Sequence, residues 1–116
     1  MLLVVSLSYA CGDRAEVRAE WTPIDPNRAP PVALDVLAAA GEGSNLYHWE
    51  HRWWPDSCLG VEVHGGACLL VETRGYMFLV EKNGWLIEYH ADDKGGFVRA
   101  GFVGPLRDYA PDEPIP

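Results

Sequence analysis

The chain has 116 residues, of which 48% are hydrophobic and 22% charged, and this is the composition of one ordinary globular domain. Nine Lys and Arg residues against 17 Asp and Glu residues leave a net charge of −8. A protein that binds nucleic acid directly needs a basic face, because counterion release drives that binding. The charge therefore argues against direct nucleic-acid binding and favours a basic protein as the partner.

The N-terminal segment contains two runs in which hydrophobic and polar residues alternate with the period of a β-strand. These runs are residues 3–9 and 15–21, and Cys11-Gly12-Asp13 between them suits a turn. The sequence therefore predicts an N-terminal hairpin. The segment lacks the basic start and the long apolar run of a signal peptide, so we expect a cytoplasmic location. No apolar stretch approaches the roughly 20 residues that cross a bilayer, and no membrane partner is expected.

One short helix is predicted over residues 32–40. The preceding segment, residues 22–31, is rich in proline, which removes backbone donors and disfavours both strand and helix. Residues 32–40 are mostly good helix formers, and Pro30 and Pro31 are tolerated in a first turn. Gly41 stands where a left-handed residue usually ends a helix.

The rest of the chain reads as strands separated by turns. The predicted strands are residues 46–54, 59–64, 67–73, 76–82, 85–91 and 97–103, and the turns between the last five are Gly65-Gly66, Arg74-Gly75, Asn83-Gly84 and residues 92–96. Asn-Gly between apolar runs is the strongest short-range hairpin signal. The prediction is an α+β fold, an antiparallel β-meander with an N-terminal β-hairpin and one short helix packed on one face. Residues 1–104 form a single domain, and residues 105–116 form an extended, acidic, proline-rich tail.

Two-residue turns fix the register of a hairpin, so side chains can be assigned to the two faces of the sheet. The face predicted to be the core under the helix carries Leu69, Val71, Tyr76, Phe78, Val80, Trp85, Ile87 and Tyr89. The opposite face carries Cys68, Leu70, Glu72, Met77, Leu79, Glu81, Leu86, Glu88 and His90. Two interpretations of this second face stay open. It is either a layer covered within the monomer or a binding surface of apolar residues among carboxylates.

No group of residues has the pattern of a catalytic or metal site. His48 and His51 would point to opposite faces of a strand, and no Cys-x-x-Cys pair is present, so no metal is predicted. Nothing near Cys58 would activate it as a nucleophile. Three cysteines leave at least one free thiol, which argues against a disulfide framework. We therefore expect no catalytic residue and no cofactor.

Five tryptophans are a high number for this length, and three of them lie close together. The segment of residues 47–54 contains Trp49, Trp53 and Trp54 together with Tyr47 and two histidines. Arg52 lies in the same segment and could stack on an indole ring. Such a cluster is either a part of the core or a recognition patch.

The layout resembles that of small bacterial immunity proteins that neutralise polymorphic toxins. The resemblance rests on an N-terminal hairpin, a helix and then a meander with the segments Leu59-Gly-Val-Glu-Val-His-Gly-Gly-Ala-Cys-Leu-Leu-Val-Glu72 and Gly75-Tyr-Met-Phe-Leu-Val80. It covers the layout only, and the chain lacks the additional C-terminal helix of several such families. The resemblance implies an acidic, non-enzymatic inhibitor that docks on a basic toxin. Phage-encoded inhibitors of host nuclease complexes have the same physical profile.

The leading hypothesis is therefore a small acidic protein inhibitor of a basic partner, either a toxin or a nucleic-acid-binding enzyme. Its predicted partner-binding residues are Glu72, Met77, Leu79, Glu81, Leu86, Glu88, Trp53 and Trp54. The alternative hypothesis is a ligand-binding or enzymatic β-cone or barrel, whose pocket would be lined by tryptophan together with His48, Glu50, His51 and His90.

Overall fold

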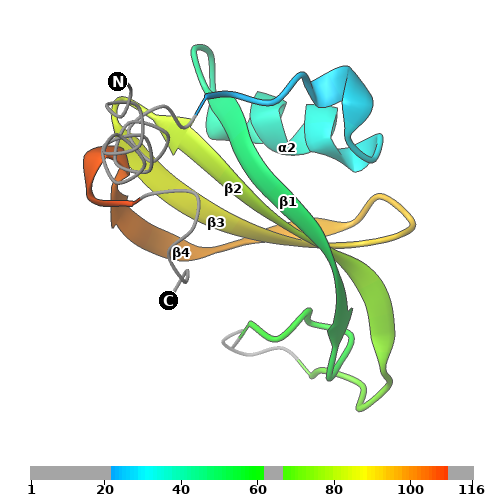
Figure 1. Cartoon of the computed structure of the whole chain (residues 1–116). Coiled ribbons are helices and arrows are strands. Elements are labelled where there is room, and N and C mark those ends of the chain that lie inside the picture. Colours follow the sequence, from blue (N-terminus) through cyan, green and yellow to red (C-terminus); the bar gives the residue numbers. More distant parts are fainter. Residues whose placement is uncertain (1–21, 62–66, 110–116) are drawn as a thin grey trace, which may run out of the picture.

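The computed structural model describes residues 22–61 and 67–109 (Figure 1). Its elements in chain order are η1 (Pro26–Arg28), α2 (Val32–Ala40), β1 (Asn45–Trp54), β2 (Thr73–Lys82), β3 (Trp85–Asp92), β4 (Phe97–Pro105) and η2 (Leu106–Asp108). The four strands of this part of the chain form an antiparallel sheet in the order β1-β2-β3-β4, with α2 packed on one face. The α+β class and the meander are confirmed. The predicted hairpin of residues 3–21 lies outside the described residues.

The predicted helix is confirmed with its boundaries. α2 follows Pro30 and Pro31 and ends before Gly41, whose φ of +113° favours glycine and whose N–H donates to the Leu37 carbonyl at 3.1 Å. The helix buries Val32, Ala33 and Val36 against the sheet. These residues form an apolar face, and the burial of this face holds the helix on the sheet.

The Asn83-Gly84 turn also forms as predicted. Asn83 and Gly84 have φ of +53° and +86°, the pattern of a type I′ turn. The N–H of Gly84 donates to the Glu81 carboxylate at 2.7 Å. The turn sets the expected register between β2 and β3, in which Val80 lies opposite Ile87.

The predicted turn at Arg74-Gly75 is wrong, because both residues lie inside β2. Gly75 pairs with Arg52 of β1 on one side and with Asp92 of β3 on the other. A Cβ atom at Gly75 would clash with the Ala91 carbonyl oxygen, so glycine is needed for close approach of the backbones and not for a turn. Residues 59–61 and 67–72 are accordingly not in strands.

The sheet has a hydrophobic cluster on each face. The helix-side cluster holds Val32, Ala33, Val36, Leu46, Phe78, Val80, Ile87, Tyr89 and Ala91. The cluster on the opposite face holds Trp54, Leu59, Met77, Leu79 and Leu86, with partly buried residues of β4 and η2 against it. The second face is therefore covered within the monomer, and this resolves the question left open by the sequence. Trp85 was assigned to the helix-side core but is 48% exposed, because α2 packs on β1 and β2.

The C-terminal residues stay folded beyond the predicted end of the domain. β4 continues to Pro105, and the N–H of Leu106 donates to the Gly84 carbonyl at 2.7 Å. The Tyr109 hydroxyl donates to the Val103 carbonyl at 2.9 Å. The chain from residue 105 to 109 is thus packed against the sheet, and residues 110–116 of the predicted tail lie outside the described residues.

A loop between β1 and β2 extends past the sheet, and we call its described residues, 55–61 and 67–72, the arm (Figure 1). A disulfide joins Cys58 to Cys68 across the arm, so the prediction against a disulfide is wrong. An odd number of cysteines leaves one over but does not prevent two from pairing. The fold of the arm brings the two Cα atoms to 5.4 Å, within the range that a disulfide needs.

Candidate partner-binding surface

Most of the apolar residues predicted to bind a partner are buried. Met77, Leu79 and Leu86 are at most 2% exposed, and Trp54 is 5% exposed. They form the second hydrophobic cluster, so they cannot contact a partner while the domain is folded. The prediction for these four residues is wrong, because the sequence does not show that C-terminal residues and the arm cover this face. Trp53, by contrast, is 61% exposed.

The three predicted carboxylates do not form a common rim. Glu72 is exposed on the arm. Glu81 accepts hydrogen bonds from the Asn45 side-chain amide at 3.0 Å and from the Gly84 N–H at 2.7 Å, and therefore holds the ends of two strands. Glu88 is bonded to His90. Two of the three thus have structural partners.

His90 is a buried polar side chain in the second cluster, at 8% exposure. Its Nδ1 lies 2.7 Å from the Leu59 carbonyl oxygen, and its Nε2 lies 2.5 Å from a Glu88 carboxylate oxygen. A carbonyl can only accept, so Nδ1 carries a proton. The Nδ1 contact thus holds the arm to β3, and the Nε2 contact is made within β3.

The histidines of the alternative hypothesis do not share a pocket. His48 and Glu50 are bonded to each other at 2.9 Å on the face away from α2. His51 lies on the opposite face of β1, and His90 is buried against Trp54. Within the described residues, these four side chains therefore do not all line one face of the sheet. Within residues 22–61 and 67–109, no three His, Cys, Asp or Glu side chains converge as metal ligands, and no helix is long and apolar enough to span a membrane.

The pKa of Glu50 is lower than its ordinary value of 4.5. The hydrogen bond with His48 is the main cause, and Arg52, whose Nε donates at 2.5 Å, adds to it against the opposing effect of partial burial. The three side chains form a row along β1, and their charges are satisfied by one another. This row is a stabilising network and not a free anionic site.

A partly exposed aromatic strip continues the helix-side face of the sheet beyond α2: two of its residues are exposed, and the other two are partly buried against the helix-side cluster. We define it as Trp49, His51 and Trp53 of β1 with Tyr76 of β2. The Tyr76 ring centroid lies 5.3 Å from that of His51 and 6.1 Å from that of Trp49. A register shift between Leu46 and His48 places Leu46 and Trp49 on this same face, although they are three residues apart. Arg74 stacks over the Trp53 ring at 5.6 Å.

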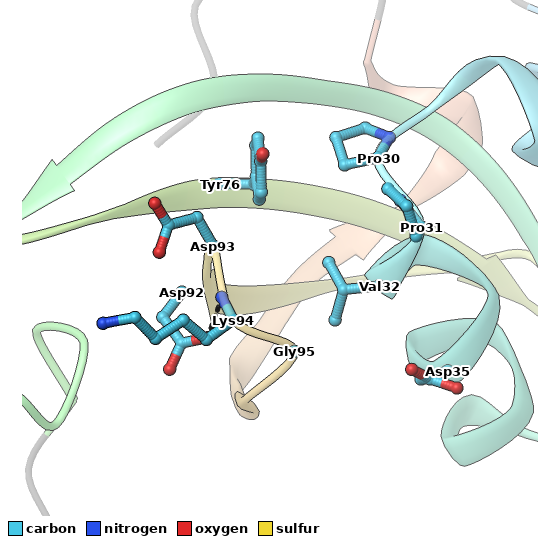
Figure 2. A pocket seen from close by; sticks show the side chains of 9 residues that line it. All are labelled: Pro30, Pro31, Val32, Asp35, Tyr76, Asp92, Asp93, Lys94 and Gly95. Atoms are coloured by element: carbon cyan, nitrogen blue, oxygen red, sulfur yellow. Dashed lines mark hydrogen bonds between the residues drawn. The ribbon is translucent and has the colours of Figure 1, made fainter.

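A cleft of about 260 Å³ adjoins the strip, between the start of α2 and the β3–β4 turn (Figure 2). Its lining residues are Pro30, Pro31, Val32, Asp35, Tyr76, Asp92, Asp93, Lys94 and Gly95. Figure 2 shows Tyr76 and Asp93 on one side, Pro31 and Val32 on the other, and the Lys94 amine pointing away from α2. Three carboxylates and one ammonium give the cleft a negative charge. We call it the acidic cleft.

The β3–β4 turn that carries two of these carboxylates is held in place by its own hydrogen bonds. The Asp92 carboxylate accepts from the N–H groups of Lys94 and Gly96, each at 2.8 Å. The N–H of Asp93 donates to the Arg74 carbonyl at 3.1 Å. The backbone of Asp93 is thereby held in place, and its exposed carboxylate lies on the same side of the cleft as Tyr76 (Figure 2).

The sequence interpretation missed the acidic cleft. Asp92 and Asp93 were interpreted as a solvated turn, and Tyr76 was assigned to the core. The missing information was the length of the helix relative to the sheet. A helix of nine residues cannot cover strands of ten residues, because its rise per residue is less than half that of a strand.

The chain was compared with known proteins. No curated protein and no solved structure matches it. A family described as a domain of unknown function, DUF8738, matches residues 33–100, which is more than half of the chain. The matched residues run from α2 into β4 and include Tyr76 and the β3–β4 turn. The chain belongs to the DUF8738 family.

Proposed function

We propose that the protein is a small acidic, non-enzymatic inhibitor that binds and blocks a basic protein partner through the acidic cleft and the aromatic strip. The observation that carries this proposal is the position of Tyr76, which belongs to both. Its ring lines the cleft with three carboxylates and contacts His51 of the strip. Negative charge and exposed aromatic area thus lie on one continuous surface.

The cleft suits a single cationic side chain. Its volume of about 260 Å³ is below the roughly 300–1,000 Å³ of small-molecule pockets. A lysine or arginine of the partner would lie against the Tyr76 ring and pair with Asp93, combining a cation–π contact with a charge-assisted hydrogen bond. Trp53 would supply an apolar anchor next to it, since tryptophan, tyrosine and arginine dominate interface energetics.

The net charge acts at longer range. A charge of −8 attracts a basic partner before contact and raises the rate of association, an effect that salt weakens. The partner is of the class of toxins or nucleic-acid-binding enzymes, because these carry the basic surfaces that bind phosphates. Nucleic-acid-binding enzymes work inside the cell, so we propose a cytoplasmic location.

The resemblance to immunity proteins supports an inhibitory role without catalysis. The two histidine-carboxylate pairs also support a role without catalysis, because their polar groups already bond one another or other groups of the fold. His90 is bonded to Glu88 and Leu59, and Glu50 to His48 and Arg52. Neither pair leaves a group poised toward the cleft.

The experiment is affinity capture from the source cell with three forms of the protein, followed by mass spectrometry. The forms are the natural chain, Asp93→Lys in the cleft and Asp108→Lys at η2, at the opposite end of β3 and β4. Both substitutions change the net charge equally at exposed positions. The natural chain and Asp108→Lys should retain one basic protein and inhibit its activity, and Asp93→Lys should do neither. Equal retention by all three forms would contradict the use of the cleft.

A further inference from the structure

The two halves of the arm are joined by the Cys58–Cys68 disulfide, across a separation of 10 residues. The half after Cys68 has few other attachments. Leu69, Leu70 and Val71 are 66%, 90% and 54% exposed, so they add no core packing. Ser57 donates its N–H to the Leu69 carbonyl at 2.9 Å and accepts the Leu69 N–H at its hydroxyl at 2.8 Å. Among the described residues, the disulfide is thus the strongest link between the two halves of the arm.

The half before Cys68 is docked on the sheet through Leu59. The Leu59 side chain is 5% exposed and belongs to the second hydrophobic cluster, and its carbonyl oxygen bonds His90. Leu59 has a φ of +61°, a left-handed conformation that is unfavourable for leucine and persists only where its surroundings impose it. The Asp56 carboxylate supports this turn by accepting from the N–H groups of Cys58 and Gly60 at 3.0 and 3.1 Å.

We propose that Cys58–Cys68 is a reversible redox clamp: its reduction releases the arm from the sheet, while the sheet and α2 stay folded. The proposal rests on the cytoplasmic location given under the proposed function, and it explains how a disulfide fits there. Disulfides are rare in reducing compartments, and those that form are usually transient or redox-sensing. Both cysteines are partly exposed, so a reductant can reach them.

The chemistry is thiol–disulfide exchange with a dithiol reductant. A thiolate of the reductant attacks the sulfur of one cysteine, breaks the Cys58–Cys68 bond and forms a mixed disulfide. The second thiolate of the reductant breaks the mixed disulfide. Two electrons and two protons reach Cys58 and Cys68, which become thiols, and the reductant becomes a disulfide. Oxidation of the two thiols by a disulfide reverses each step.

The size of the effect follows from the loop that the disulfide closes. The two cysteines are 10 residues apart, and opening a loop of this length restores chain entropy. This entropy should raise the ratio of released to docked arm roughly 100-fold. The sheet should not respond in the same way, because Phe78 and Val80 are fully buried in the helix-side cluster, which contains no residue of the arm.

The experiment is hydrogen exchange, read by mass spectrometry on the full chain before and after treatment with dithiothreitol. Cys11→Ser serves as the background, so that Cys58 and Cys68 are the cysteines present, and iodoacetamide labelling counts their thiols. A Cys58→Ser/Cys68→Ser variant provides a permanently open clamp. The His90 ring, followed by NMR, reports whether the Leu59 carbonyl is still bonded.

We expect no labelling before reduction and two labels after it. Exchange in residues 56–60 and 67–72 should then rise about 100-fold, and β2 and β3 should keep their protection. The double serine variant should match the reduced protein. Labelling before reduction, unchanged exchange in the arm, or loss of protection throughout the sheet would each overturn the proposal. None of these readings depends on a partner, so they separate it from the proposed inhibition.

Discussion

The imidazole of His90 stacks on the indole of Trp54, with ring centroids 4.0 Å apart and planes 18° apart. The indole N–H donates to the Ala91 carbonyl at 2.9 Å, while the imidazole bonds the Leu59 carbonyl and Glu88. The end of β1, the arm and β3 therefore meet at one buried stack. This arrangement explains why the second face of the sheet is covered and why Trp54 is a core residue.

Replacing His90 by phenylalanine should destabilise the protein, although the stack with Trp54 is kept. The substitution removes the ring nitrogens that bond the Leu59 carbonyl and the partly exposed Glu88 carboxylate, and the buried carbonyl left unsatisfied should cost about 1–3 kcal/mol. Urea denaturation measures the change. Glu88→Gln is the control, because its amide can donate to Nε2 and should be tolerated. A His90→Phe variant as stable as the natural protein would contradict this role.

Leu79→Ala should cost about 2–5 kcal/mol of unfolding free energy, the range for truncating a buried leucine. Leu79 is 0% exposed, whereas Leu70 on the arm is 90% exposed. Leu70→Ala should therefore change the stability by less than about 0.5 kcal/mol. Thermal or urea unfolding of the two variants compares them directly. Similar losses at both positions would mean that Leu70 is packed, against its exposure in the structure.

Asn83→Pro should destabilise the β2–β3 hairpin by about 1–3 kcal/mol. Asn83 has a φ of +53°, and proline is locked near −65°, so the type I′ turn cannot form. Asn83→Gly allows the same φ and should be close to neutral. A calorimetric melting curve of each variant tests the difference, and an unchanged Asn83→Pro would show that the turn does not fix the register.

Local signals in the sequence were sufficient for the helix, for β1, β3 and β4, and for the β2–β3 register. Gly41 and Asn83-Gly84 act through backbone conformations that few other residues adopt, so their meaning does not depend on the rest of the fold. Gly75 failed as a signal for the opposite reason. Its role is the close approach of Ala91, a residue of another strand, and no local pattern reveals that.

The candidate surface was harder to predict than the fold. Of the predicted partner-binding residues, Trp53 is exposed, whereas Met77, Leu79 and Leu86 are buried. Whether a face of a sheet is exposed depends on what packs over it, here the arm and residues after β4. Tyr76 lines the acidic cleft because α2 does not extend over it. The position of the helix on the sheet is a tertiary property, and the alternation of side chains along a strand does not reveal it.

The stability of the protein should fall in acid partly through Glu50. The pKa of Glu50 is lower in the folded protein than its ordinary 4.5, so its contribution is present above that value and is lost as the pH falls below it. Glu50→Gln should therefore flatten the stability curve between about pH 5 and pH 3. His48→Phe removes the hydrogen bond that lowers the pKa most and should flatten it likewise. Urea midpoints over this range test the prediction, and parallel curves for all three proteins would contradict it.

Binding of a basic partner at the acidic cleft beside Tyr76 can be tested by one calorimetric comparison. Titrate the captured partner into Asp93→Lys and into Asp108→Lys, after confirming that both variants melt like the natural protein. Both have the same net charge, so long-range attraction is weakened alike, and the Kd values differ only through the position of the new charge. Asp93→Lys should bind the partner at least about tenfold more weakly than Asp108→Lys, a difference of about 1.4 kcal/mol. Equal Kd values for the two variants would contradict it.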